Sequence, residues 1–154
     1  MCGGMEFVKH QQDLTEEEFN EAVRGTGAGV ERFIRVYFPN PKAALLVDAA
    51  TDLWLPWGRH NEQPGDWPGG GWAREESLSK RYWTRWHPEQ VIVHPARWME
   101  KDRSRVSRWF EMEPGQGILC LRLDDAPWTP LYVVTRPAEG DFLADIHDRI
   151  PVVA

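Results

Sequence analysis

Short runs of branched and aromatic residues, bounded by Gly, Pro or Asp, recur along most of the chain. Runs of this length and composition are typical of β-strands. We predict six strands, at Val30–Phe38, Ala43–Val47, Gln90–His94, Val106–Met112, Ile118–Leu123 and Leu131–Thr135.

One segment near the start has helical rather than strand periodicity. Thr15 and Glu18 have the spacing of a capping box, and Phe19, Ala22 and Val23 follow on one helical face. This predicts a short amphipathic helix over residues 15–24, which the glycine-rich segment 25–29 ends. Together with the strands, it predicts an α+β fold with a curved, mostly antiparallel, barrel-like sheet and few short helices.

The chain of 154 residues is long enough for one hydrophobic core. We therefore expect a single domain over residues 1–154. The segment 56–71 contains three prolines and five glycines, which predicts a long surface loop. Loops of this length in compact domains are often functional.

Composition narrows the class of protein. No stretch has the length and apolarity of a signal peptide or a membrane span, and the two cysteines suggest no disulfide framework. We expect a cytoplasmic protein that does not bind a membrane. The histidines and cysteines lack the paired spacing of a zinc site, so we expect no metal and no cofactor.

The net charge of −6 argues against a nucleic-acid-binding protein, but the charge is unevenly distributed. Residues 72–108 contain nine basic and five acidic side chains, and four of the nine tryptophans lie there. Most tryptophans are expected to pack in the core. Aromatic rings between cations are also typical of proteins that bind single-stranded nucleic acid.

Cys2 is the strongest candidate for a reactive residue. Removal of Met1 would leave an α-amine and a thiol on one residue, and such an aminothiol reacts with an aldehyde first through nitrogen and then through sulfur. An α-amine with a pKa near ~8 is partly neutral at pH 7. From its position alone, however, a cysteine here also fits an ordinary terminal tail.

Several motifs resemble the SOS-response-associated peptidase (SRAP) family. The chain begins Met1-Cys2-Gly3, as SRAP proteins do, and residues 146–151 (IHDRIP) are similar to the family's Ile-His-Asp/x-Arg-Met-Pro motif. Residues 55–58 (LPWG) lie where the family has a Trp-Gly turn. Residues 72–77 (WAREES) resemble Asn-Ala-Arg-x-Glu-Thr, and residues 95–100 (PARWME) resemble a Pro-Ala-x-Gly stretch that ends at a glutamate.

The resemblance implies a function in DNA damage. SRAP proteins capture abasic sites in single-stranded DNA when the mature N-terminal cysteine forms a thiazolidine with the ring-opened sugar. By position, Cys2 is then the nucleophile, Glu100 positions or deprotonates its amine, and His147 is the general acid and base for ring opening. The implied DNA-binding residues are Arg74, Arg149, Trp57, Trp67 and Trp72.

The chain also departs from the family pattern. Gly4 replaces an arginine, Trp72 replaces the asparagine that contacts the sugar, and Lys101 replaces a tryptophan. The chain stops soon after Pro151, so we expect the usual C-terminal extension to be lacking. Two alternatives stay open: a DNA-binding or protein-interaction module without the chemistry, and a thiol hydrolase that uses Cys2 and His147.

Overall fold

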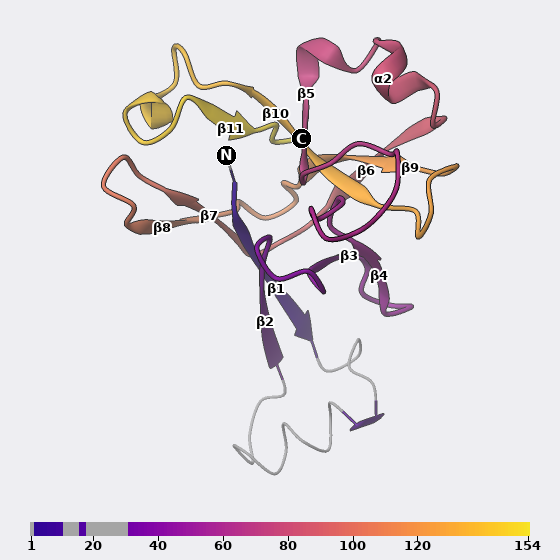
Figure 1. Cartoon of the computed structure of the whole chain (residues 1–154). Helices are drawn as coiled ribbons and strands as arrows, with labels where there is room; N and C mark the ends of the chain where they lie inside the picture. The colour runs from indigo at the N-terminus through magenta and orange to yellow at the C-terminus, as the bar shows by residue number, and fades with distance from the viewer. Residues whose placement is uncertain (1, 11–15, 18–30) are drawn as a thin grey trace.

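The computed structural model describes residues 2–10, 16–17 and 31–154, which form three sheets (Figure 1). The first sheet has the order β2-β1-β7-β8, and each of its pairs is antiparallel. Its strands are β1 (Gly4–His10), β2 (Glu31–Tyr37), β7 (Arg97–Lys101) and β8 (Ser107–Glu111).

The second sheet has the order β11-β10-β9-β6, with β5 added in parallel to β10. Its strands are β5 (Trp72–Arg74), β6 (Pro88–Val93), β9 (Ile118–Leu123), β10 (Leu131–Pro137) and β11 (Arg149–Pro151). β3 (Ala44–Asp48) and β4 (Leu53–Pro56) form a hairpin with an irregularity between Leu46 and Asp48. The described helices are η2 (Glu75–Ser77), α2 (Arg81–Thr84) and η3 (Phe142–Asp145).

This architecture confirms the predicted α+β fold with mostly antiparallel sheets. All six predicted strands are present, with ends shifted by at most two residues. The pairing of the described strands leaves the sheets open, so hydrogen bonds do not close them into a barrel. The predicted helix over residues 15–24 lies outside the described residues, apart from Glu16 and Glu17, which are helical and exposed.

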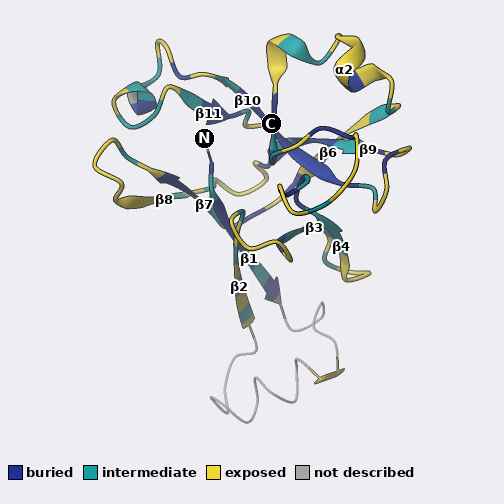
Figure 2. Ribbon diagram, viewed as in Figure 1, coloured by how far each residue is buried: buried dark blue, intermediate teal, exposed yellow. Residues whose placement is uncertain are grey.

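β10 is the central strand of the core, and it is buried on both faces (Figure 2). Val133 packs with Met5, Phe7 and Trp98 of the first sheet, in the larger apolar cluster. Tyr132 and Val134 point to the opposite face because side chains alternate along a strand. They belong to a second cluster with Trp83, Leu121 and Leu123, among others.

The segment 56–71 is irregular, as predicted, but it is not simply a surface loop. Trp57 is fully buried, its indole N–H donates to Gly71 O at 3.0 Å, and Trp67 is only 7% exposed. Arg59 and Gly70 pair across the loop, beside Gly58 with φ +64°. A Cβ on Gly58 would lie 2.0 Å from Gly70 O, so only glycine fits this close approach. The loop is therefore anchored to the core at both ends.

Candidate functional site

A cleft of about 700 Å³ opens where the N-terminal segment meets the first sheet and the segment before β11. Gly3, Trp72, Glu100 and His147 all line it. The cleft thus brings together parts of the chain that are far apart in sequence, and it contains two of the three residues predicted to carry the chemistry.

Cys2, the third of these residues, lies next to the cleft and is fully buried. The Trp72 indole donates to Cys2 O at 2.7 Å, and Gly3 N donates to Met99 O at 2.9 Å. The Cys2 thiol donates to Gly4 O at 3.4 Å. Burial, with a smaller contribution from the Glu100 charge, raises the pKa of this thiol to about 12. The thiol is therefore protonated at neutral pH.

Glu100 extends from β7 into the base of the cleft, where it is 2% exposed. Burial raises the pKa of its carboxyl above the usual value, although a hydrogen bond from the Lys101 backbone N–H opposes the shift. A carboxyl of this kind takes up and releases a proton closer to neutral pH than an exposed glutamate does.

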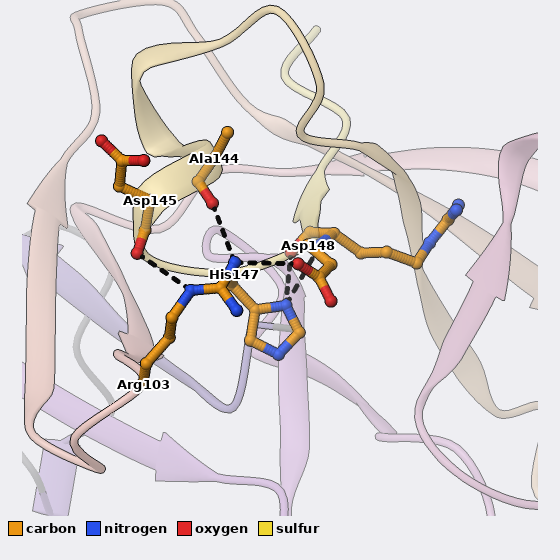
Figure 3. A network of polar contacts seen from close by, with 6 residues as sticks. Arg103, Ala144, Asp145, His147 and Asp148 are labelled. Carbon is orange, nitrogen blue, oxygen red and sulfur yellow. Dashed lines mark hydrogen bonds and ion pairs between the residues drawn. The ribbon is translucent and has the colours of Figure 1, made fainter.

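His147 is held by a short, well-bonded turn (Figure 3). Asp141 caps η3 by accepting from Leu143 N at 3.0 Å, and Arg103 donates to Ala144 O, Asp145 O and Asp148 Oδ1 at 3.1–3.4 Å. His147 Nδ1 lies 3.1 Å from Arg149 N and 3.1 Å from Arg149 O. It accepts from the N–H when the ring proton is on Nε2, and it donates to the carbonyl when the proton is on Nδ1.

The charge state of His147 follows from the same surroundings. Partial burial lowers the pKa of the imidazole below its usual value, and the Arg103 charge adds to the effect. The histidine is therefore mainly neutral at pH 7, and a neutral ring can donate one hydrogen bond and accept one.

The predicted DNA-binding residues do not form one surface. Trp72 lines the cleft and Arg74 is exposed at the end of β5. Trp57 and Trp67 are buried in the core, so neither presents a face to a DNA base, and the stacking role expected of them is wrong for this structure. Both rings lie in a segment rich in Pro and Gly, which has no periodicity that would have indicated their burial.

Arg149 is also engaged inside the protein. Its guanidinium donates to Glu76 Oε1 at 2.6 Å, to Thr135 O at 2.8 Å and to Thr135 Oγ1 at 3.0 Å. Its side chain is 14% exposed. Arg149 thus ties β11 to β10 and η2, which leaves little of it to contact phosphate.

The basic stretch 72–108 divides into two groups in space. One group lies on the segment from β5 to α2, and the other lies on the β7–β8 hairpin, on the other side of the view in Figure 1. Several members are ion-paired, including Arg85 with Asp66, Arg97 with Glu6 and Arg108 with Asp102. The local excess of charge in the sequence is therefore not one patch.

Some residues of the cleft were not expected from the sequence. Tyr37 and Phe38 form part of its wall, and Arg103 and Lys101 add positive charge at its rim. Tyr37 belongs to a strand in which exposed and half-buried residues alternate. This alternation of burial shows that one face of the sheet is open, and Tyr37 lies on that face.

Within the described ranges, no three His, Cys, Asp or Glu side chains are grouped closely enough to hold a metal ion. No described helix is long and apolar enough to cross a membrane. Comparison of the chain with known protein families, with curated proteins and with solved structures gives no match.

Proposed function

We propose that this protein captures abasic sites in single-stranded DNA as a covalent thiazolidine adduct through Cys2, after removal or self-processing of Met1. The observation that carries the proposal is the cleft, in which Glu100 and His147 lie beside the segment that holds Cys2. Convergence of an acid, a base and a nucleophile from distant parts of a chain is what such chemistry requires.

The chemistry has two bond-forming steps. The Cys2 amine attacks C1 of the ring-opened sugar, and loss of water gives an imine. The thiol then adds to the imine carbon, its proton goes to nitrogen, and the five-membered ring closes. Glu100 in its ionised form accepts the proton that the amine loses. A protonated His147 delivers a proton to the sugar ring oxygen as it opens, and the resulting neutral ring takes up the proton of the C1 hydroxyl.

A denaturing gel of the protein incubated with an oligonucleotide that bears one abasic site tests the proposal. Mass spectrometry first establishes that Met1 is absent. Wild type is expected to give an adduct that survives denaturation, and Cys2→Ala is expected to give none, because alanine forms only the reversible imine. His147→Ala is expected to slow adduct formation by roughly 10²- to 10⁴-fold, the usual contribution of a proton donor.

The burial of Cys2 favours a second candidate, a DNA-binding or protein-interaction module that lacks the chemistry. The thiol is fully buried, so capture requires the first residues to shift toward the cleft. A processed wild-type protein that gives no adduct would support this candidate.

A thiol hydrolase is less favoured, because a thiol with a pKa raised to about 12 is a poor source of thiolate. A cytoplasmic location is part of the proposal, since a reducing compartment keeps both cysteines as thiols.

A further inference from the structure

An unusual row of side chains crosses the first sheet. Tyr37, Gly4, Met99 and Trp109 are paired in register on β2, β1, β7 and β8, so they share one face. Although two strands separate β2 from β8, the rings of Tyr37 and Trp109 meet with centroids 6.1 Å apart, edge to face. The two rings therefore lean toward each other across the middle of the sheet.

Gly4 makes this arrangement possible. A Cβ at this position would lie 3.2 Å from both Tyr37 Cδ1 and Met99 Cε, which is tighter than ordinary contact. The absence of a side chain leaves room for the two rings above the strand. Met99 beneath them is 4% exposed, whereas Tyr37 remains 41% exposed.

The next row on the same face is charged. Glu6 lies between Arg35 and Arg97 in register, and its carboxylate accepts from them at 2.7 and 3.1 Å. Burial would raise the pKa of Glu6, but the hydrogen bonds and charges of the two arginines hold it below the usual value, so it is ionised.

Two guanidinium groups thus share one carboxylate, and their side chains remain 48% and 36% exposed. The Arg35 guanidinium also lies over the Trp109 ring, 4.8 Å from its centroid. Lys101 adds a third cation to this face, and Glu111, opposite Arg97 at the outer edge, adds a second carboxylate. A third carboxylate, Glu31, lies on the same face at the far end of β2 from Tyr37. The three cations therefore outnumber the two carboxylates only in the part of the face beside the two rings.

This face is continuous with the cleft, because Tyr37, Met99, Lys101 and Ser107 line the cleft as well. We propose that Tyr37, Trp109, Arg35 and Arg97, here called the aromatic–arginine platform, bind the nucleotides of single-stranded DNA that flank the reacting one. The proposal rests on the proposed function. Bases stack on the two rings and the arginines contact phosphates, as in other single-strand binders.

Fluorescence anisotropy with a labelled, undamaged oligothymidylate tests the platform without the covalent step. The variants Tyr37→Leu and Trp109→Leu keep an apolar cover over Met99 but remove the rings. Each is expected to raise Kd by roughly 5- to 100-fold, the usual effect of losing one stacking ring. Trp109→Phe is expected to restore most of the affinity.

Trp128→Leu is the matched control, since Trp128 is 76% exposed on the turn between β9 and β10 and takes no part in the platform. Its Kd should equal that of wild type. An unchanged Kd in Trp109→Leu that has a wild-type circular dichroism spectrum, or an equal loss in Trp128→Leu, overturns the proposal. The proposal is also overturned if the platform binds a proline-rich peptide and does not bind oligothymidylate.

The two proposals fail in different ways. If the platform is wrong and capture is right, the platform variants form adduct at the same DNA concentrations as wild type. If capture is wrong and the platform is right, wild type and Cys2→Ala bind undamaged DNA equally and neither forms an adduct. If both are right, the platform variants need more abasic DNA for half-maximal adduct but reach the same final yield.

Discussion

Glu100 and His147 are both driven toward their neutral forms, because burial raises the pKa of the carboxyl and lowers that of the imidazole. An exposed glutamate would be more fully ionised, and an exposed histidine would be more readily protonated. The pKa values of the two groups in the cleft are thus closer together than those of an exposed glutamate and an exposed histidine. Environments that shift titratable groups in this way are typical of sites with acid–base chemistry.

Replacing Glu100 makes it possible to measure the free-energy cost of burying its carboxyl group. Because its pKa is raised on folding, wild type has its full stability below about pH 4.5 and loses some as the pH rises through the folded-state pKa. The glutamine of Glu100→Gln does not titrate. The melting temperature of this variant minus that of wild type is therefore expected to increase from pH 4 to pH 8. Glu139→Gln, at an exposed position, is the control for removal of one charge. A constant difference across this range would contradict the prediction.

Trp72 combines two functions that substitutions can separate. Its ring packs against Phe38, with centroids 4.6 Å apart, and its N–H holds Cys2 O. Trp72→Phe keeps the ring and loses one hydrogen bond, so it should cost about 1 kcal/mol of stability and slow capture. Trp72→Asn should cost roughly 3–5 kcal/mol through lost packing but open space for the sugar, so adduct per folded molecule should rise. A stably folded Trp72→Asn without that gain would exclude a steric effect.

Individual residues differed in how well the sequence predicted them. Cys2, Glu100 and His147 became candidates mainly through the flanking motifs, because a lone glutamate among Lys101, Asp102 and Arg103 resembles a solvated charge. The burial of Trp57 and Trp67 depends on how the irregular loop folds back onto the core, which no local pattern encodes.

At the scale of elements, the strands that were missed either are short or have charged side chains at buried positions. β1 contains Glu6 and Lys9, both buried and ion-paired, with Arg35 and Asp52 respectively among their partners. β7 likewise contains the buried Glu100. A charged residue indicates solvent exposure until its partner is known, and these partners come from distant segments of the chain. β5 and β11 have three residues each, too few for any periodicity.

The Arg149 side chain ties β11 to β10 and to η2, which makes this residue a test of element stability. Arg149→Met removes the donors to Thr135 and Glu76, so it is expected to lower the free energy of unfolding in urea by about 1–3 kcal/mol. Glu76→Gln should cost less than about 1 kcal/mol, because this carboxylate is half exposed. If Arg149→Met instead left stability intact and weakened DNA binding, Arg149 would be a phosphate ligand.

At the scale of the whole molecule, the first sheet supplies Glu100 and the proposed platform, and the second sheet supplies the central strand of the core, with His147 in the segment before β11. The sequence predicted the fold class because strand patterns are local. It did not predict which face of the first sheet is open, since that depends on how β2, β1, β7 and β8 pair across long separations.

The two separated groups of basic residues give different expectations for the salt dependence of DNA binding. The negative net charge repels DNA, so binding relies on local cations that compete with salt. Three phosphate contacts, from Arg35 and Arg97 of the platform and from Lys101 beside it, predict that log Kd rises with log salt concentration with a slope of about 2, at about 0.7 per contact for single strands. Lys101→Gln should lower this slope by about 0.7. Arg81→Gln, on α2 in the other group, should leave it unchanged. The reverse result, with Arg81→Gln changing the slope and Lys101→Gln not, would place the DNA on the β5–α2 segment and away from the cleft rim.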